Sequence, residues 1–365
     1  MNIDPTLTQA RLALAEISLR TGDLDSAIEE GNKAVQANPD DLRTHLILGN
    51  AYLGKRDTKM ATRHFQQMVT IDPKNPSGYH HLAQVALAQK NFTEAESQFE
   101  KTLSLNPDFF PALSDIASIY VHQKKPEKAI ERVKKQIKIS PKNAYFYHLL
   151  ARLYESNKEM EPAESSFKKA IDLQPDSATF LVSLGSFYVR RKTVDKAIKE
   201  YQAAIEKNPN YFRAYMLLGT IYESRKDFQK ARGHYERVLK IAPEFAPAAN
   251  NLAWLEAEHF GDLDRAFNLA QMAKEKLPED AGISDTLGWI YYKKNIFTRA
   301  IAHLEECKEK TPDRPVVRYH LGMAYFKNGQ MSLAEKELKK ALELNPDFEG
   351  AEEAKKTLAE IRERG

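Results

Sequence analysis

The sequence predicts an all-α fold in which similar helix pairs stack into an array, and three columns of residues carry this prediction. The first column is a proline that recurs every 34 residues, with a single interval of 35. Repeats of this length bury their apolar faces only against their neighbours, so a constant period indicates a stacked array. The ten prolines are Pro39, Pro73, Pro107, Pro141, Pro175, Pro209, Pro243, Pro278, Pro312 and Pro346.

The second and third columns predict how the helices touch. An alanine twelve residues before each proline marks a crossing so close that a larger side chain would overpack it. The alanines are Ala27, Ala61, Ala95, Ala129, Ala163, Ala197, Ala231, Ala266, Ala300 and Ala334. The third column is aliphatic and anchors the core, with Gly or Ala after it to admit the next helix. Its members are Leu14, Leu48, Leu82, Ile116, Leu150, Leu184, Leu218, Leu252, Leu287 and Leu321.

Aromatic residues recur on the same helical faces as these columns. Tyr52 follows Gly49 by three residues, and Phe65 follows Ala61 by four, and such spacings place side chains on one face of a helix. Each repeat is therefore predicted to hold two amphipathic helices joined by a turn, such as the turn around Gly22. The column proline ends the second helix, because proline lacks the N–H that a helix interior requires.

The order of small residue, Tyr, Ala, aromatic residue and Pro at this period resembles the tetratricopeptide repeat, from about Thr8 to Phe348. The resemblance implies a right-handed α-solenoid superhelix of about ten antiparallel helix pairs plus a C-terminal capping helix. The first helices would line a concave groove, and the second helices would form the convex side. We expect a polar leader at residues 1–7, the ten-repeat solenoid at 8–348 and a solvating helix at 349–365.

Two repeats depart from the family pattern. Repeat one has Arg11, Ser18 and Gly31 where the family favours large aromatic residues, which suits an end repeat. Repeat eight carries one extra residue near positions 258–261, together with Ala270 in the second aromatic column. We expect the extra residue to alter the superhelical pitch locally.

Composition argues against nucleic acid as a partner and against a membrane span. Lys and Arg number 54 against 51 Asp and Glu, a net charge of only +3, whereas nucleic-acid binding requires a basic surface. No stretch approaches the ~18 apolar residues of a spanning helix, and the start lacks a secretory signal. Cys307 is the one cysteine of the sequence, so the chain cannot form an internal disulfide. Whether the chain is a fragment of a longer protein stays open, and with it the compartment: the cell envelope for a lipoprotein fragment, the cytoplasm otherwise.

The residues predict a protein that is not an enzyme and that holds no cofactor or metal. The ten histidines are scattered, and none forms the i, i+4 pair with a glutamate that helical zinc sites use. Adjacent His80 and His81 point about 100° apart on a helix, so they cannot share a metal. We interpret the histidines as polar groove and surface residues. The sequence contains no glycine-rich phosphate loop or nucleophile motif.

A basic run lies in repeat four, mainly on the predicted second helix. Its members are Lys124, Lys125, Lys128, Arg132, Lys134, Lys135, Lys138 and Lys142. Because Glu127 and Glu131 interrupt it, a solvated convex surface explains the run, and an acidic partner or a lipid headgroup is the alternative.

The candidate binding site is an aromatic cluster on the predicted concave side of repeats eight to ten. Partly exposed rings beside polar groups are typical of a binding hot spot. The family's geometry implies a peptide- or protein-binding groove at Asn250, Trp254, Asp285, Trp289, Tyr292, Tyr319, Met323 and Phe326. Two alternatives stay open: these repeats curl tightly and bury the rings against each other, or another segment of a longer protein covers the rings. In repeats one to seven the groove positions are mixed in character, for example Asn50, Leu53, Gln84 and Leu87.

Two segments narrow the resemblance: residues 250–258 (NNLAWLEAE) and 285–294 (DTLGWIYYKK). They are similar to the C-terminal repeats of bacterial envelope tetratricopeptide proteins that accompany exosortase and exopolysaccharide systems. The resemblance implies an interaction scaffold that holds a peptide in its groove and organises a bacterial multiprotein assembly. Two other hypotheses stay open: a regulatory or substrate-recruiting arm of a larger enzyme, and a scaffold that self-associates.

Overall fold

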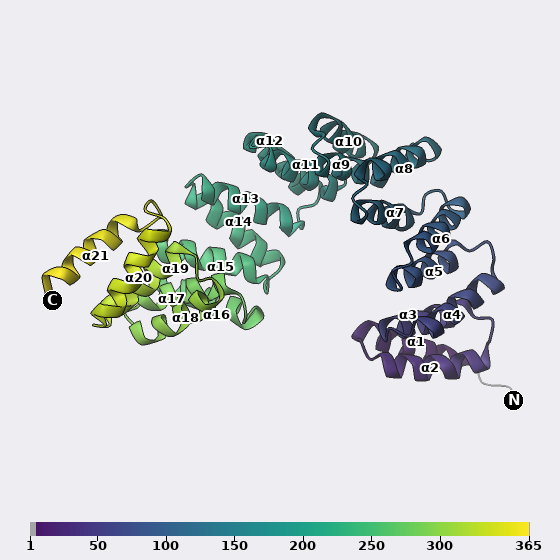
Figure 1. Cartoon of the computed structure of the whole chain (residues 1–365), viewed down its shortest axis with the longest axis horizontal. Helices are drawn as coiled ribbons and strands as arrows, with labels where there is room; N and C mark the ends of the chain where they lie inside the picture. The colour runs from purple at the N-terminus through teal and green to yellow at the C-terminus, as the bar shows by residue number, and fades with distance from the viewer. Residues whose placement is uncertain (1–4, 365) are drawn as a thin grey trace. The chain divides into compact units, whose positions relative to one another are not determined.

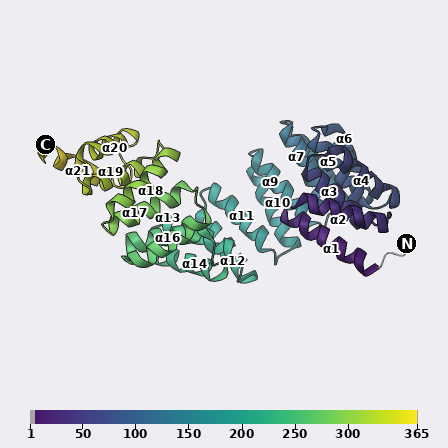
Figure 2. The same ribbon diagram turned by 90° about the horizontal axis from the view of Figure 1, so that it is seen from below.

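The protein is an all-α solenoid, as its sequence predicts. The computed structural model describes residues 5–364, and within that range the chain forms helices joined by short turns, without a strand. Within each of the two compact units described next, consecutive helices pack on each other in chain order (Figures 1 and 2). The chain divides into two compact units, Met1–Pro175 and Asp176–Gly365.

Unit 1 consists of five helix pairs. Their bounds are α1 (Pro5–Thr21), α2 (Leu24–Ala37), α3 (Leu42–Gly54), α4 (Thr58–Ile71), α5 (Pro76–Ala88), α6 (Phe92–Leu105), α7 (Phe110–His122), α8 (Pro126–Ile139), α9 (Ala144–Ser156) and α10 (Met160–Leu173).

Unit 2 consists of five further pairs, a π-helix η1 and a final helix. Their bounds are α11 (Ala178–Arg190), α12 (Val194–Lys207), α13 (Phe212–Ser224), α14 (Phe228–Ile241), α15 (Ala246–Leu255), η1 (Glu256–Phe260), α16 (Leu263–Lys276), α17 (Ala281–Lys293), α18 (Phe297–Lys310), α19 (Pro315–Lys327), α20 (Met331–Leu344) and α21 (Ala351–Arg364).

The proline column ends the second helix of every repeat, as predicted. Each second helix stops two residues before its proline, for example at Ile71 before Pro73. The residue before a proline disfavours the helical conformation, and the proline itself cannot donate a helical hydrogen bond. The next helix often starts on a side-chain cap: Asp41, two residues after Pro39, accepts a hydrogen bond from the backbone N–H of Thr44 at 2.7 Å.

The small-residue columns lie at helix crossings. All ten column alanines are fully buried. A Cβ added at Gly49 would lie 2.3 Å from the Phe65 ring, which explains why a small residue follows the aliphatic column there. Leu14 corrects the prediction that every aliphatic column residue anchors the core. It is 50% exposed, because no described helix precedes α1.

The extra residue of repeat eight is accommodated as the π-helix η1. A π turn adds one residue to a helix without breaking its direction, and Gly261 ends it in the left-handed region at φ 73°. The insertion carries Glu256 into the core, where the carboxylate is fully buried. There it pairs with Arg232 at 2.8 Å and Arg265 at 2.9 Å.

Helix α21 closes unit 2. Its residues Ala351, Ala354, Leu358 and Ile361 are buried, and the helix packs on α19 and α20. The division into leader, solenoid and solvating helix stays a prediction. Residues 1–4 of the leader lie outside the described residues, and α1 begins at Pro5.

Candidate functional site

The eight predicted site residues come from three first helices of unit 2. Asn250 and Trp254 belong to α15. Asp285, Trp289 and Tyr292 belong to α17. The last three, Tyr319, Met323 and Phe326, belong to α19. The site therefore draws on three consecutive repeats, as the 34-residue spacing predicts.

The rings of this site pack on one another. The Trp289 ring stacks on Tyr292 with a centroid distance of 4.5 Å and on His320 at 4.0 Å. Tyr319 lies 5.8 Å from Trp289. Trp254 reaches His320, two repeats further along the chain, at 5.8 Å. First helices of alternate repeats thus meet through their side chains.

Charged groups fix the rings in place. The Nε1 of Trp289 donates to Glu258 Oε1 at 2.5 Å, and Lys293 pairs with the same oxygen at 2.8 Å. On the other side, His320 Nδ1 lies 2.8 Å from Asp285 Oδ1 in a buried contact. Every polar partner in this set comes from unit 2 itself, so the cluster is organised without a ligand.

The expectation of exposed rings is corrected by the structure. Trp289 is only 7% exposed, and Asp285, Tyr319, Met323 and Phe326 are also buried. The alternative in which these repeats curl tightly therefore describes these five residues. Contacts between first helices of alternate repeats cover the inner surface of unit 2. Asn250, Trp254 and Tyr292 remain partly exposed. Binding of a peptide to those three stays a prediction.

The C-terminal end of the array completes the burial. Phe348 packs against Tyr319 with a ring distance of 5.5 Å. A Cβ at Gly350 would lie 2.5 Å from the Tyr319 ring, so only glycine allows this approach. From α21, the hydroxyl of Thr357 lies 3.5 Å from the sulfur of Met323. The rings thus belong to the core of unit 2.

Sequence reasoning missed Glu258 and His320, which organise the cluster. Glu258 comes from η1, and the extra residue of repeat eight was the signal that could have indicated it. His320 carries no column signal, because it is buried by contacts with Trp254, Asp285 and Trp289 of the two preceding repeats, which are not repeated along the array. One polar atom of Asn250 is unsatisfied: its Oδ1 is buried and accepts no hydrogen bond from any described residue.

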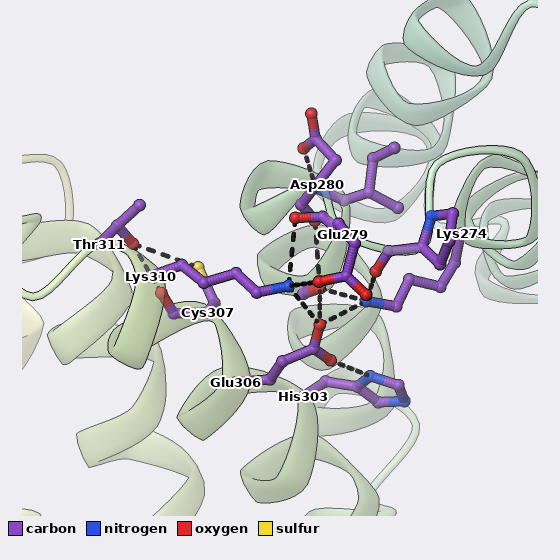
Figure 3. A network of polar contacts seen from close by, with 11 residues as sticks. Lys274, Glu279, Asp280, His303, Glu306, Cys307, Lys310 and Thr311 are labelled. Atoms are coloured by element: carbon purple, nitrogen blue, oxygen red, sulfur yellow. Dashed lines mark hydrogen bonds and ion pairs between the residues drawn. The ribbon is translucent and has the colours of Figure 1, made fainter.

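A second polar cluster in unit 2 ties repeats eight and nine together (Figure 3). Lys274 contacts Glu306 at 2.7 Å and Ser284 at 2.7 Å, and Lys310 contacts Glu279 at 2.7 Å. Burial acts to raise the pKa of Glu306, but hydrogen bonds from Lys274 and Lys310 outweigh it and lower the pKa. With both lysines engaged, we interpret the cluster as a structural clasp.

The thiol of Cys307 lies beside this cluster, inside the core. Cys307 is fully buried, and burial raises the pKa of its thiol, which disfavours the reactive thiolate. Among residues 5–364, no three His, Cys, Asp or Glu side chains gather in a way that could hold a metal ion. None of the helices in the same range has the length and apolar character needed to cross a bilayer.

Comparison with known families agrees with the repeat pattern. Residues 133–249 match the cytochrome c-type biogenesis protein H TPR domain. Residues 8–42, 86–153 and 315–348 match tetratricopeptide repeat families. The chain belongs to the tetratricopeptide repeat proteins. This fold is a protein-interaction scaffold, generally non-catalytic, and none of the matched families is a catalytic one.

A solved structure with a TM-score of 0.50 shares the fold at low sequence identity, and others resemble the chain with lower scores. The APC/C hetero-tetramer Cut9-Hcn1 matches with 13% identity and a TM-score of 0.50, covering 96% of this chain and 95% of that one. A tetratricopeptide repeat protein from Parabacteroides merdae matches with 18% identity and a TM-score of 0.48, covering 69% and 98%. YrrB, described as a TPR protein with an unusual peptide-binding site, matches with 21% identity and a TM-score of 0.44, covering 53% and 100%. No curated protein matches the sequence.

In unit 1 several of the tetratricopeptide groove positions are partly or fully exposed. Leu53 of α3 and Leu87 of α5 are half-buried, and Val121 of α7 is exposed. The three occupy the same place in successive repeats, so they form a row of accessible aliphatic side chains. Asn50 and Gln84, one helical turn earlier, present half-exposed amides beside this row. We call Asn50, Leu53, Gln84, Leu87 and Val121 the unit 1 row.

Proposed function

We propose that this protein is a non-catalytic scaffold that binds an extended peptide or protein segment on the concave side of its repeats. In this proposal the unit 1 row is the principal contact surface. The scaffold would hold its partner within a bacterial multiprotein assembly related to the cell envelope, to export or to exopolysaccharide. The envelope assignment rests on the resemblance of residues 250–258 and 285–294 alone.

One observation carries the proposal: the aliphatic side chains of this row keep part of their surface accessible, although Leu53 also packs against the core cluster around Phe65. Leu53, Leu87 and Val121 repeat at 34-residue intervals, and each could take an apolar side chain of a bound segment. The amides of Asn50 and Gln84 have donors and acceptors for its backbone. A groove usually recognises an extended peptide through apolar pockets for its side chains and hydrogen-bonding groups for its backbone.

A displayed peptide library selected on the whole protein would test the unit 1 row. The ligands obtained would be measured against a Leu53→Glu/Leu87→Glu variant. A buried carboxylate facing an apolar ligand side chain costs well over 1.4 kcal/mol, so we expect at least a tenfold weaker affinity. Leu333→Glu is the matched control, since Leu333 is an exposed leucine on α20, and its affinity should stay near that of wild type.

Trp254→Ala separates the two candidate surfaces. Ligands that bind the unit 1 row should be insensitive to this change in α15. If Trp254→Ala weakens every selected ligand and Leu53→Glu/Leu87→Glu weakens none, the principal contact lies in the site on α15, α17 and α19 that the sequence predicts, and the unit 1 row is rejected.

Two alternatives are tested by simple observations. A regulatory or substrate-recruiting arm would be encoded in one gene with a catalytic domain. A self-associating scaffold would show a mass that rises with concentration in light scattering. Neither alternative is favoured by a specific contact within residues 5–364.

A further inference from the structure

The second helix of repeat four carries an unusual share of the protein's positive charge. Residues 124–142 contain eight basic and two acidic side chains, a net charge of +6, whereas the whole chain has +3. The other 346 residues therefore sum to a negative charge. A local excess of this size sets up a positive potential that the rest of the molecule does not share.

Of the eight basic side chains, five lie on α8 itself, which has a net charge of +3 over Pro126–Ile139. Ala129, Ile130, Val133 and Gln136 turn the opposite side of α8 into the core. The lysines are exposed along the outer side, from Lys128 to Lys138 and on to Lys142 beyond the helix. We call Lys128, Lys135, Lys138, Ile139 and Lys142 the α8 strip.

Ion pairs within the protein neutralise only part of this positive charge. Arg132 is bound by Glu100 of α6 at 2.5 and 2.8 Å, and Lys135 pairs with Glu131 at 2.9 Å. Lys138 and Lys142 form no ion pair with any residue of the described range. Between them lies Ile139, 62% exposed and the most exposed large apolar side chain in the described part of unit 1.

From these features we infer that the α8 strip binds an acidic protein segment, which lies along α8 with carboxylates facing the lysines and an apolar side chain against Ile139. The strip is one helix wide. The second helices before and after it, α6 and α10, carry net charges of −2 and −1. A narrow acidic segment avoids these flanking carboxylates, whereas a flat anionic membrane would approach them as well.

The use of lysine rather than arginine for these charges also fits a polypeptide ligand. Lysine presents a mobile point charge, whereas tight bidentate recognition of a phosphate favours arginine. The one arginine of the helix is already occupied by Glu100. A ladder of lysines over about 15 Å, the rise of ten helical residues, suits carboxylates spaced along a chain.

The test uses the whole protein and a fluorescent oligoglutamate peptide of about 14 residues, enough to span α8. We expect binding that weakens as salt rises from about 50 to 300 mM, because exposed charges are screened. A Lys128→Glu/Lys135→Glu/Lys138→Glu variant should bind at least about tenfold more weakly. Lysine and glutamate have similar helix propensities, so circular dichroism should report an unchanged fold.

The matched control reverses three lysines elsewhere. Lys59, Lys199 and Lys240 are exposed on the second helices α4, α12 and α14, and their change to Glu gives the same net charge. The inference requires this control to bind like wild type. It is overturned if the control loses as much affinity as the α8 variant, or if wild type does not bind the peptide. Binding to vesicles with about 30% phosphatidylserine, without binding to the peptide, would equally overturn it in favour of a membrane.

Discussion

At the scale of single residues, burial determines the hydrogen bonds and the protonation of several histidines. The sequence predicts polar groove and surface histidines, but His45, His64, His80 and His320 are buried. His45 Nε2 lies 2.7 Å from the carbonyl oxygen of Pro39, so it donates there. Its Nδ1 must then accept from His64 Nδ1 at 3.1 Å. This leaves His64 Nε2 as a buried acceptor without a partner in the described range.

This arrangement predicts acid sensitivity in unit 1. Burial lowers the pKa of His64 from 6.5 to about 4, with smaller contributions from His45 and Arg63. The folded state therefore binds fewer protons than the unfolded state between these two values, and stability present above pH 6.5 is lost as pH falls toward 4. The shift corresponds to about 3 kcal/mol. Urea unfolding at pH 7 and 4.5 should show a marked loss of stability on acidification.

The matched variants isolate His64 from other acid effects. His64→Phe should reduce the loss between pH 7 and 4.5, because a ring that does not titrate stays in the core. His122→Gln replaces an exposed histidine and should leave the pH dependence unchanged. Equal pH slopes in wild type and His64→Phe would show that the buried imidazole is not the group responsible.

At the scale of elements, the turn inside each repeat holds a conformation that its residues do not favour. Gly22 and Gly329 have positive φ, as expected, but the equivalent turns of most other repeats place Arg, Lys or Asn there. Lys90 has φ 61°, and the left-handed region costs a residue with a Cβ about 1–2 kcal/mol. The sequence predicted the turn but not this strain, because a lysine in a polar turn gives no sign of its φ.

Lys90→Gly should therefore stabilise the protein. The relief of left-handed strain, about 1–2 kcal/mol, exceeds the extra entropy that glycine loses on folding, and we expect a net gain of about 0.5 kcal/mol. Gln89→Gly is the control one residue earlier, where φ is −81°, and it should destabilise by about 0.5–1 kcal/mol. Thermal unfolding measures both. Two changes of the same sign would contradict the backbone explanation.

At the scale of the whole molecule, the architecture was predictable and the inner surface of unit 2 was not. The proline and alanine columns report contacts between adjacent repeats, which are alike in every repeat. The burial of Trp289 depends on contacts across two repeats, such as Trp254 with His320, and on the charge of Glu258 in η1. None of the repeated residue columns encodes these contacts, because each contact occurs only once and not in every repeat. The same spacing that placed the site residues on one face therefore left their exposure open.

This difference predicts unequal stability of the two units. Solenoid contacts are made between neighbours, so fragments 1–175 and 176–365 should each fold. Fragment 176–365 buries Trp289, Tyr319 and Phe326 on its inner side, each worth on the order of 3 kcal/mol. In fragment 1–175 most of the equivalent side chains, such as Leu53, Gln84 and Val121, are partly or fully exposed. We expect two cooperative urea transitions followed by circular dichroism, with the higher midpoint for 176–365. An equal or reversed order of midpoints would contradict a stabilising inner core.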